Sequence, residues 1–151
     1  MYRALIVLVV ALLSVAPSAA AQQSDVMAAV HRFGDAFNKG DTKAVNAACS
    51  DQAVIIDEFP PYVWRGPGTC GKWMDAYAAD ATKNKITDGQ VTLGKELHVD
   101  ITGDHAYVVM PARYVFKKDG KPVSEDSSSI TMVLQKRATE WTVAGWAWTK
   151  R

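Results

Sequence analysis

GDHAYVVMPARYVFKKDG, residues 103–120, contains two turn signals with a long run of strand-forming residues between them. Gly103-Asp104 predicts a tight turn and Asp119-Gly120 predicts a hairpin, because glycine adopts the positive φ angles that such turns require. The residues between them, 105–117, predict one long strand. The C-terminal part of the chain is therefore predicted to be built around this strand.

Further strand signals lie on both sides of this segment. A short β-branched run predicts a strand at 53–56, and apolar–polar alternation, the period of a half-buried strand, predicts another at 91–101 with a bend at Gly94. Two more strand-like segments follow at 127–136 and 140–149. Together with 105–117 they predict an antiparallel meander.

Three helices are predicted in the first half of the chain. The first begins at the cap Ser24-Asp25 and ends at Gly40, and it carries one apolar stripe formed by Val26, Val30, Phe33 and Phe37. Asp41 caps a second, short helix, and Thr69 caps a third that runs to about residue 81. The order α-α-β-α-β-β-β-β predicts an α+β domain with its helices on one face of an antiparallel sheet.

The N-terminus has the three parts of a secretion signal. Arg3 supplies a positive start, residues 4–15 form an apolar run, and residues 19–21 are small enough for cleavage. The apolar run is too short to span a membrane, which needs ~20 residues. We therefore expect a signal peptide at 1–21, one domain at 22–151, no stable membrane insertion, and a secreted or periplasmic location after cleavage near Ala21.

The composition of the mature segment argues against several partners. Without Arg3, 16 of the 17 basic residues remain and balance the 16 acidic residues, so the formal net charge is zero. With no basic block, there is no electrostatic basis for binding nucleic acid. The three histidines show no metal-ligand spacing, so we expect no metal and no cofactor. Five tryptophans and five tyrosines favour an aromatic core or an aromatic-lined cavity.

Several segments together resemble the SnoaL-like members of the NTF2-like superfamily. They are FNKGD (37–41), AVIID (53–57), WRG (64–66), GDHAYVV (103–109) and EWTVAGWAWT (140–149). The resemblance implies a cone, in which a curved antiparallel sheet wraps around the N-terminal helices and the pocket opens near the loop after the first strand. It also implies a homodimer through the outer face of the sheet. It does not specify a function, because this fold hosts isomerases, cyclases, dehydratases and non-catalytic modules.

The chain has two cysteines, Cys49 and Cys70. An even count in an oxidising compartment suggests a disulfide, and two buried thiols are the alternative. The resemblance brings the end of the second helix close to the start of the third, where these cysteines lie. It therefore implies a Cys49–Cys70 bridge.

Asp57 is the candidate general base, because ketosteroid isomerase-like members carry a catalytic aspartate at this strand end. Desolvation at the rim of an apolar pocket raises the pKa of a carboxyl toward a useful range. A solvated aspartate, or one paired with an arginine, is the alternative. The oxyanion donors of the isomerases are missing, because Phe33 and either Ser129 or Ile130 stand at the matching positions. This disfavours steroid isomerisation.

Alternation places Tyr107 and Arg113 on one face of the 105–117 strand, and the resemblance makes that face the concave one. An arginine inside an apolar cavity needs an anion, which would be Asp57, Glu58 or a ligand carboxylate. A register shifted by one residue is the alternative and leaves Arg113 in solvent. The residues turned inward would then be Ala106, Val108, Met110, Ala112 and Tyr114.

The predicted ligand-binding residues are Tyr62, Trp64, Trp73, Tyr77, Tyr107, Arg113 and Met132. Tyr62 and Trp64 lie in a loop and are candidates for a pocket lid, whereas core packing is the alternative for the other aromatic residues. We expect an exported protein whose apolar pocket binds a small ligand, with Arg113 holding an acidic group. The alternatives are an acid/base enzyme of isomerase, cyclase or dehydratase type that uses Asp57, and a non-catalytic dimerisation module.

Overall fold

The structure, a computed structural model, describes residues 18–150. Most of the predicted signal peptide, residues 1–17, lies outside the described residues, and so does residue 151. Among the described helices, none is both long and apolar enough to cross a membrane.

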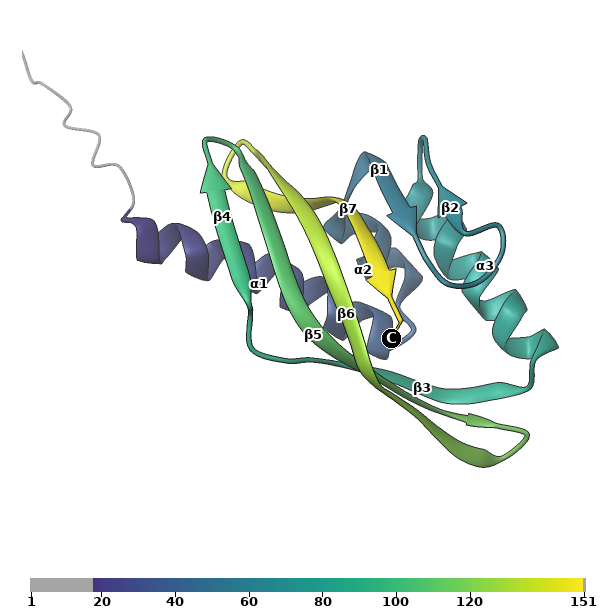
Figure 1. The fold of residues 1–151 in the computed structure, drawn as a ribbon. Coiled ribbons are helices and arrows are strands. Elements are labelled where there is room, and N and C mark those ends of the chain that lie inside the picture. The colour runs from purple at the N-terminus through teal and green to yellow at the C-terminus, as the bar shows by residue number, and fades with distance from the viewer. Residues whose placement is uncertain (1–17, 151) are drawn as a thin grey trace, which may run out of the picture.

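The described residues form three helices and seven strands (Figure 1). The helices are α1 (Ala19–Asn38), α2 (Thr42–Ala48) and α3 (Thr69–Lys83). The strands are β1 (Cys49–Ile56), β2 (Val63–Trp64), β3 (Ile86–Leu93), β4 (His98–Thr102), β5 (His105–Lys118), β6 (Lys121–Arg137) and β7 (Glu140–Thr149).

The strands form one sheet in the order β2-β1-β7-β6-β5-β3, with β4 paired to the first half of β5. All pairs are antiparallel except β1 and β7, which are parallel. The meander of β5, β6 and β7 is as predicted. The single strand expected at 91–101 is two strands, because the pairing with β5 is interrupted between Gly94, whose N–H donates to the Pro111 carbonyl, and Leu97, whose N–H donates to the Val109 carbonyl.

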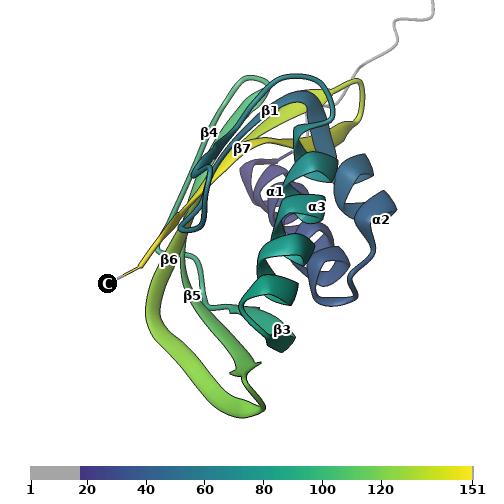
Figure 2. The same ribbon diagram turned by 90° about the vertical axis from the view of Figure 1, so that its right-hand side faces the viewer.

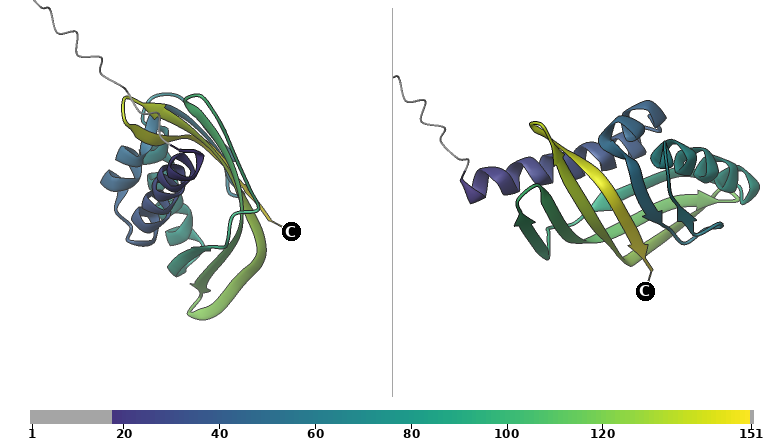
Figure 3. Two further views of the ribbon diagram at one scale, coloured as in Figure 1. Left: turned by 90° about the vertical axis from the view of Figure 1, so that its left-hand side faces the viewer. Right: turned by 90° about the horizontal axis from the view of Figure 1, so that it is seen from above.

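The helices all lie on the concave side of the sheet. Figure 2 shows the sheet bending around them, and Figure 3 shows α1 inside the curve. The predicted stripe on α1 makes this contact, since Val26, Val30 and Phe33 are buried in the core. The α+β cone predicted from the sequence is therefore confirmed.

The start of α1 differs from the prediction. The helix begins at Ala19 and its cap is Ser18, whose Oγ accepts a hydrogen bond from the Ala21 backbone N–H, rather than Ser24-Asp25. Alanine has the highest helix propensity, so residues 19–21 extend the helix toward the N-terminus.

A disulfide joins Cys49 and Cys70, as the resemblance implied. Cys49 is the first residue of β1, and Cys70 is buried in the first turn of α3. The bridge closes a segment of chain that contains β1, β2 and the loop between them. It therefore attaches the start of β1 to the start of α3, and the loop after β1, where the candidate site lies, is part of the closed segment.

Candidate functional site

An apolar cavity lies between α1, α3 and the concave face of the sheet. The centre of a water molecule could occupy about 80 Å³ of this cavity. About 10–15 Å³ of such space is enough for one water, so the cavity has room for a small organic group. The lining residues are Phe33, Gly34, Phe37, Asp57, Glu58, Phe59, Trp73, Tyr77, Val91, Leu93, Tyr114, Ile130, Met132, Trp146 and Trp148.

Trp73 of α3 lies at the centre of the aromatic wall. Its ring centroid is 5.4 Å from that of Phe37 and 4.9 Å from that of Trp146, which it meets edge to face. Such pairs add ~0.5–1.5 kcal/mol each beyond the area they bury. The wall is therefore held in place by its own contacts.

Asp57 follows β1 and brings a carboxylate to this apolar wall. Its Oδ2 accepts a hydrogen bond from Trp73 Nε1 at 2.8 Å, and its Oδ1 accepts one from the Glu58 backbone N–H at 2.8 Å. Burial raises the pKa of Asp57, and the two hydrogen bonds offset part of that rise. Within residues 18–150 no cation forms an ion pair with it. Asp57 is thus half-buried and is not paired with an arginine.

Two tyrosine hydroxyls meet in the same cavity. Tyr77 of α3 and Tyr114 of β5 lie with their oxygens 2.7 Å apart, and burial raises the pKa of both. One hydroxyl donates to the other, so the accepting hydroxyl keeps a proton for a different acceptor. Gly89 of β3 leaves room for the pair, because a Cβ there would lie 2.7 Å from the Tyr114 oxygen.

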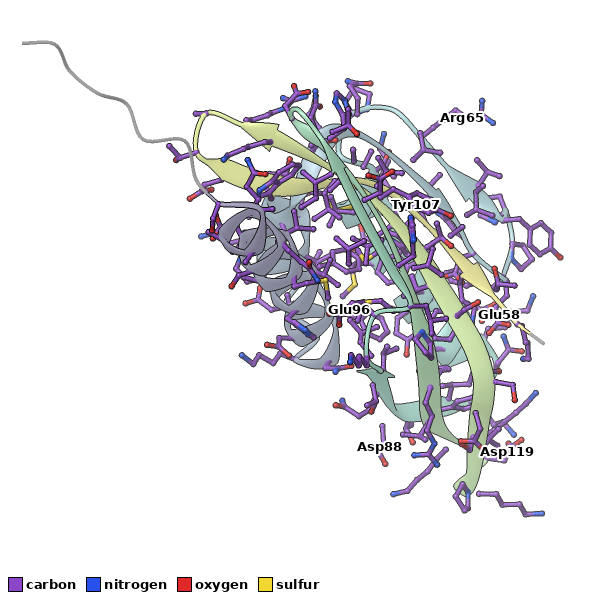
Figure 4. All side chains as sticks on the ribbon, turned by 60° about the vertical axis from the view of Figure 1, so that its left-hand side comes forward. Glu58, Arg65, Asp88, Glu96, Tyr107 and Asp119 are labelled. Carbon is purple, nitrogen blue, oxygen red and sulfur yellow. A yellow bond between two sulfur atoms is a disulfide. The ribbon has the colours of Figure 1, made fainter. Side chains whose placement is uncertain are left out.

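A second group of charges adjoins the rim of the cavity. Lys150 Nζ contacts Glu125 Oε1 and lies 3.3 Å from Glu58 Oε2. Burial and the nearby Glu125 raise the pKa of Glu58. Figure 4 shows Glu58 beside the C-terminal end of the chain, where Lys150 follows β7.

No motif predicted Glu125. Simple alternation along β6 would place residues 125 and 128 on opposite faces, but the β5–β6 register shifts between Ala112 and Tyr114. As a result, Ser128 pairs with Ala112 and Glu125 pairs with Tyr114, and partners across a ladder share a face. Both side chains therefore face the helix layer.

The predicted inward register of β5 is wrong. Tyr107 is 44% exposed on the outer face, where its ring contacts His98. Arg113 is also exposed and pairs with Asp126. The inward residues are the alternative set, in which Ala106, Val108, Met110 and Ala112 are buried. A one-residue change of register exchanges the faces, and the uncharged set is buried without the desolvation cost of an arginine.

The lid prediction is also wrong. Tyr62 is 55% exposed and Trp64 is buried against Phe59, with ring centroids 4.9 Å apart, and neither lines the cavity. The loop turns back at Tyr62, whose backbone N–H donates to the Phe59 carbonyl, and Phe59 is the loop residue that reaches the cavity. Of the other predicted ligand-binding residues, Trp73, Tyr77 and Met132 line it.

A curved sheet that encloses an aromatic cavity with helices on its concave side defines an NTF2-like cone. The family model of the SnoaL-like domain matches residues 26–146, most of the described chain. This protein therefore belongs to the SnoaL-like family. A search of curated proteins finds no match.

Solved structures share this fold at low sequence identity. A ketosteroid isomerase-like protein from Erwinia carotovora atroseptica has a TM-score of 0.66 and 19% identity, over 84% of this chain and 94% of that chain. An NTF2-like superfamily protein from Salmonella enterica has a TM-score of 0.71 and 11% identity, over 88% and 93%. A protein of unknown function from Mycobacterium tuberculosis has a TM-score of 0.70 and 17% identity, over 86% and 76%. These likenesses concern the fold alone.

Proposed function

We propose that this chain binds a small, largely apolar molecule in the cavity between its helices and its sheet. The observation that carries the proposal is the aromatic cavity with a half-buried, hydrogen-bonded carboxylate, Asp57, at its wall. Pockets that bind small molecules combine apolar walls with a few placed polar groups, and this cavity has that composition. Arg113 has no part in it, because it lies on the outer face.

A cavity-filling variant tests this proposal. Val91→Phe places a ring in the cavity, and Leu97→Phe adds a ring at a position that is 68% exposed and does not line the cavity. We expect benzyl alcohol to bind the parent chain and Leu97→Phe, with a change in tryptophan fluorescence, and to bind Val91→Phe at least tenfold more weakly. Equal binding by both variants would place the ligand elsewhere.

Catalysis by Asp57 is the second candidate function. It is favoured by the absence of an ion pair at Asp57 among residues 18–150 and by the spare hydroxyl proton of the Tyr77–Tyr114 pair. In a proton transfer next to a carbonyl, the Asp57 carboxylate would accept a proton from carbon. A tyrosine hydroxyl would donate a hydrogen bond to the carbonyl oxygen, where negative charge develops. These tyrosines would replace the donors that are missing at Phe33 and Ile130.

Hydrogen–deuterium exchange of a small ketone tests this second candidate. With cyclohexanone in D₂O, the parent chain should speed loss of the α-proton signals in NMR, and Asp57→Asn should remove ~10²–10⁴-fold of that acceleration. Glu140→Gln, an exposed carboxyl change that does not touch the cavity, should leave it intact. A parent chain without acceleration, or an active Asp57→Asn, would exclude Asp57 as the base.

Export and dimerisation are part of the proposal. The Cys49–Cys70 bridge supports export, because disulfides persist in oxidising compartments. Exposed apolar side chains on the outer face of β1 and β6, Val54, Ile56 and Val133, support a dimer through that face. Light scattering should give the mass of two chains for the parent and of one chain for Val133→Asp. A parent of single-chain mass would exclude the dimer.

A further inference from the structure

The charged groups around the cavity are predominantly acidic. Asp57 and Glu58 line it, and Glu125 adds negative charge behind them, since it acts electrostatically on both carboxyls. Lys150 is the cation in contact with this group, and it is shared between Glu58 and Glu125. Of the described residues that line the cavity, none is lysine, arginine or histidine. Three carboxyl groups therefore stand against one ammonium group.

The burial of Glu125 fixes this excess of negative charge in the folded chain. Its side chain is only 10% exposed, and while Oε1 accepts from Lys150, Oε2 is buried and has no partner within residues 18–150. A buried carboxylate oxygen without a donor is costly to leave unmatched. The negative charge at this end of the cavity is thus only partly compensated by the chain itself.

Asp57 has hydrogen-bonding capacity left for a ligand. A carboxylate offers about four acceptor sites, and two of these are taken by Trp73 Nε1 and the Glu58 N–H. The adjacent wall consists of aromatic rings, among them Phe37, Trp73 and Trp146. A ligand carboxylate in the same place would meet the like charge of Asp57 and Glu58, and none of the described residues that line the cavity is a cation that could pair with it.

We infer that the cavity selects a primary amine on a small apolar body, with the ammonium group against Asp57 and Glu58 and the body among the aromatic rings. Carboxylic acids with the same body are rejected. This inference rests on the proposed function, because it names the ligand class of the same cavity. It replaces the acidic ligand expected from the sequence, which depended on an inward Arg113.

Three small molecules that share one phenyl ring but differ in their polar group test this inference separately from the proposed function. Benzylamine, benzyl alcohol and benzoate are titrated into the disulfide-bonded chain at pH 7.5 and low salt, with calorimetry as the readout. We expect benzylamine to bind at least tenfold more tightly than benzyl alcohol, and benzoate at least tenfold more weakly. Binding of the alcohol with equal or weaker binding of the amine would overturn the selectivity and leave the proposed function standing. Binding of none of the three would overturn both.

Two neutralising variants show whether the selectivity comes from the cavity. Glu58→Gln removes a rim carboxylate, and Asp119→Asn removes an exposed one at the tip of the β5–β6 hairpin, away from Glu58 (Figure 4). We expect Glu58→Gln to weaken benzylamine binding about five- to tenfold while changing benzyl alcohol binding less than twofold. Asp119→Asn should change neither. An equal loss of amine binding in both variants would mean a general charge effect and would overturn the inference.

Discussion

The two faces of the sheet carry similar kinds of residue in different surroundings. On the outer face, Arg113 and Asp126 pair in solvent, and Tyr107 lies beside His98. On the inner face, Asp57 is held by Trp73, and Tyr114 is bonded to Tyr77 inside an aromatic cavity. Each face carries an aspartate and a tyrosine. The difference in their chemistry therefore comes from burial and not from residue type. A solvated ion pair contributes little, whereas a buried carboxyl or hydroxyl has its pKa shifted and its hydrogen bonds strengthened.

The largest difference between the faces should appear in stability. Leu134 and Val133 are neighbours on β6, with Leu134 fully buried and Val133 on the outer face. Leu134→Ala should lower the free energy of unfolding by ~2–5 kcal/mol, because it leaves a cavity in the core. Val133→Ala should lower it by less than ~0.5 kcal/mol when the urea titration is run at a protein concentration low enough for the proposed dimer to dissociate. Similar losses in both would mean that the outer face is also packed in solution.

An intermediate difference is expected for the two tyrosines of β5. Tyr114→Phe removes the hydroxyl bonded to Tyr77 and leaves the partly buried Tyr77 hydroxyl without that partner, at a cost of ~1–3 kcal/mol. Tyr107→Phe removes a hydroxyl on the exposed outer face and should cost less than ~0.5 kcal/mol. Chemical denaturation of the two variants measures both values. If Tyr107→Phe lowered the free energy of unfolding as much as Tyr114→Phe does, the two faces of β5 would not differ in this respect.

The smallest expected effects concern how stability depends on pH. The contributions of Asp57 and Asp126 should change in opposite directions as pH rises. The pKa of Asp57 is raised by burial, so its contribution to stability is present below its unfolded pKa and is lost as pH rises through its folded pKa. The pKa of Asp126 is lowered by its hydrogen bonds from Ser124 and Arg113, so its contribution is present above its unfolded pKa and is lost as pH falls.

Asn variants test these signs between pH 3 and pH 8. The stability difference between the parent and Asp57→Asn should fall as pH rises, and the difference for Asp126→Asn should grow. Melting temperatures across this range provide the measurement. Slopes of the same sign for both variants would show that burial does not control the protonation of Asp57.

Much of the site could be predicted from local signals. A β-branched run ending in aspartate was enough to bring Asp57 to a strand end, and helical spacing was enough to put Trp73 and Tyr77 on the same side of α3. Tyr114 appeared in the sequence only within the alternative register. Glu125 could not be found in this way, because the shift in the β5–β6 ladder interrupts the alternation on which the prediction depended.

The helices, the late strands and the turns between them follow from the order of the amino acids, because capping residues, glycine turns and apolar periodicity act over a few neighbouring positions. The inward face of β5 does not, since both of its faces are apolar enough to be buried. Packing against the helices selected the uncharged face, because burying Arg113 would have cost its hydration, whereas on the outer face it stays in solvent and pairs with Asp126. That choice, made by contacts between residues far apart in the chain, brought Tyr114 to Tyr77 inside the cavity and placed Glu125, its partner in the ladder, on the same face.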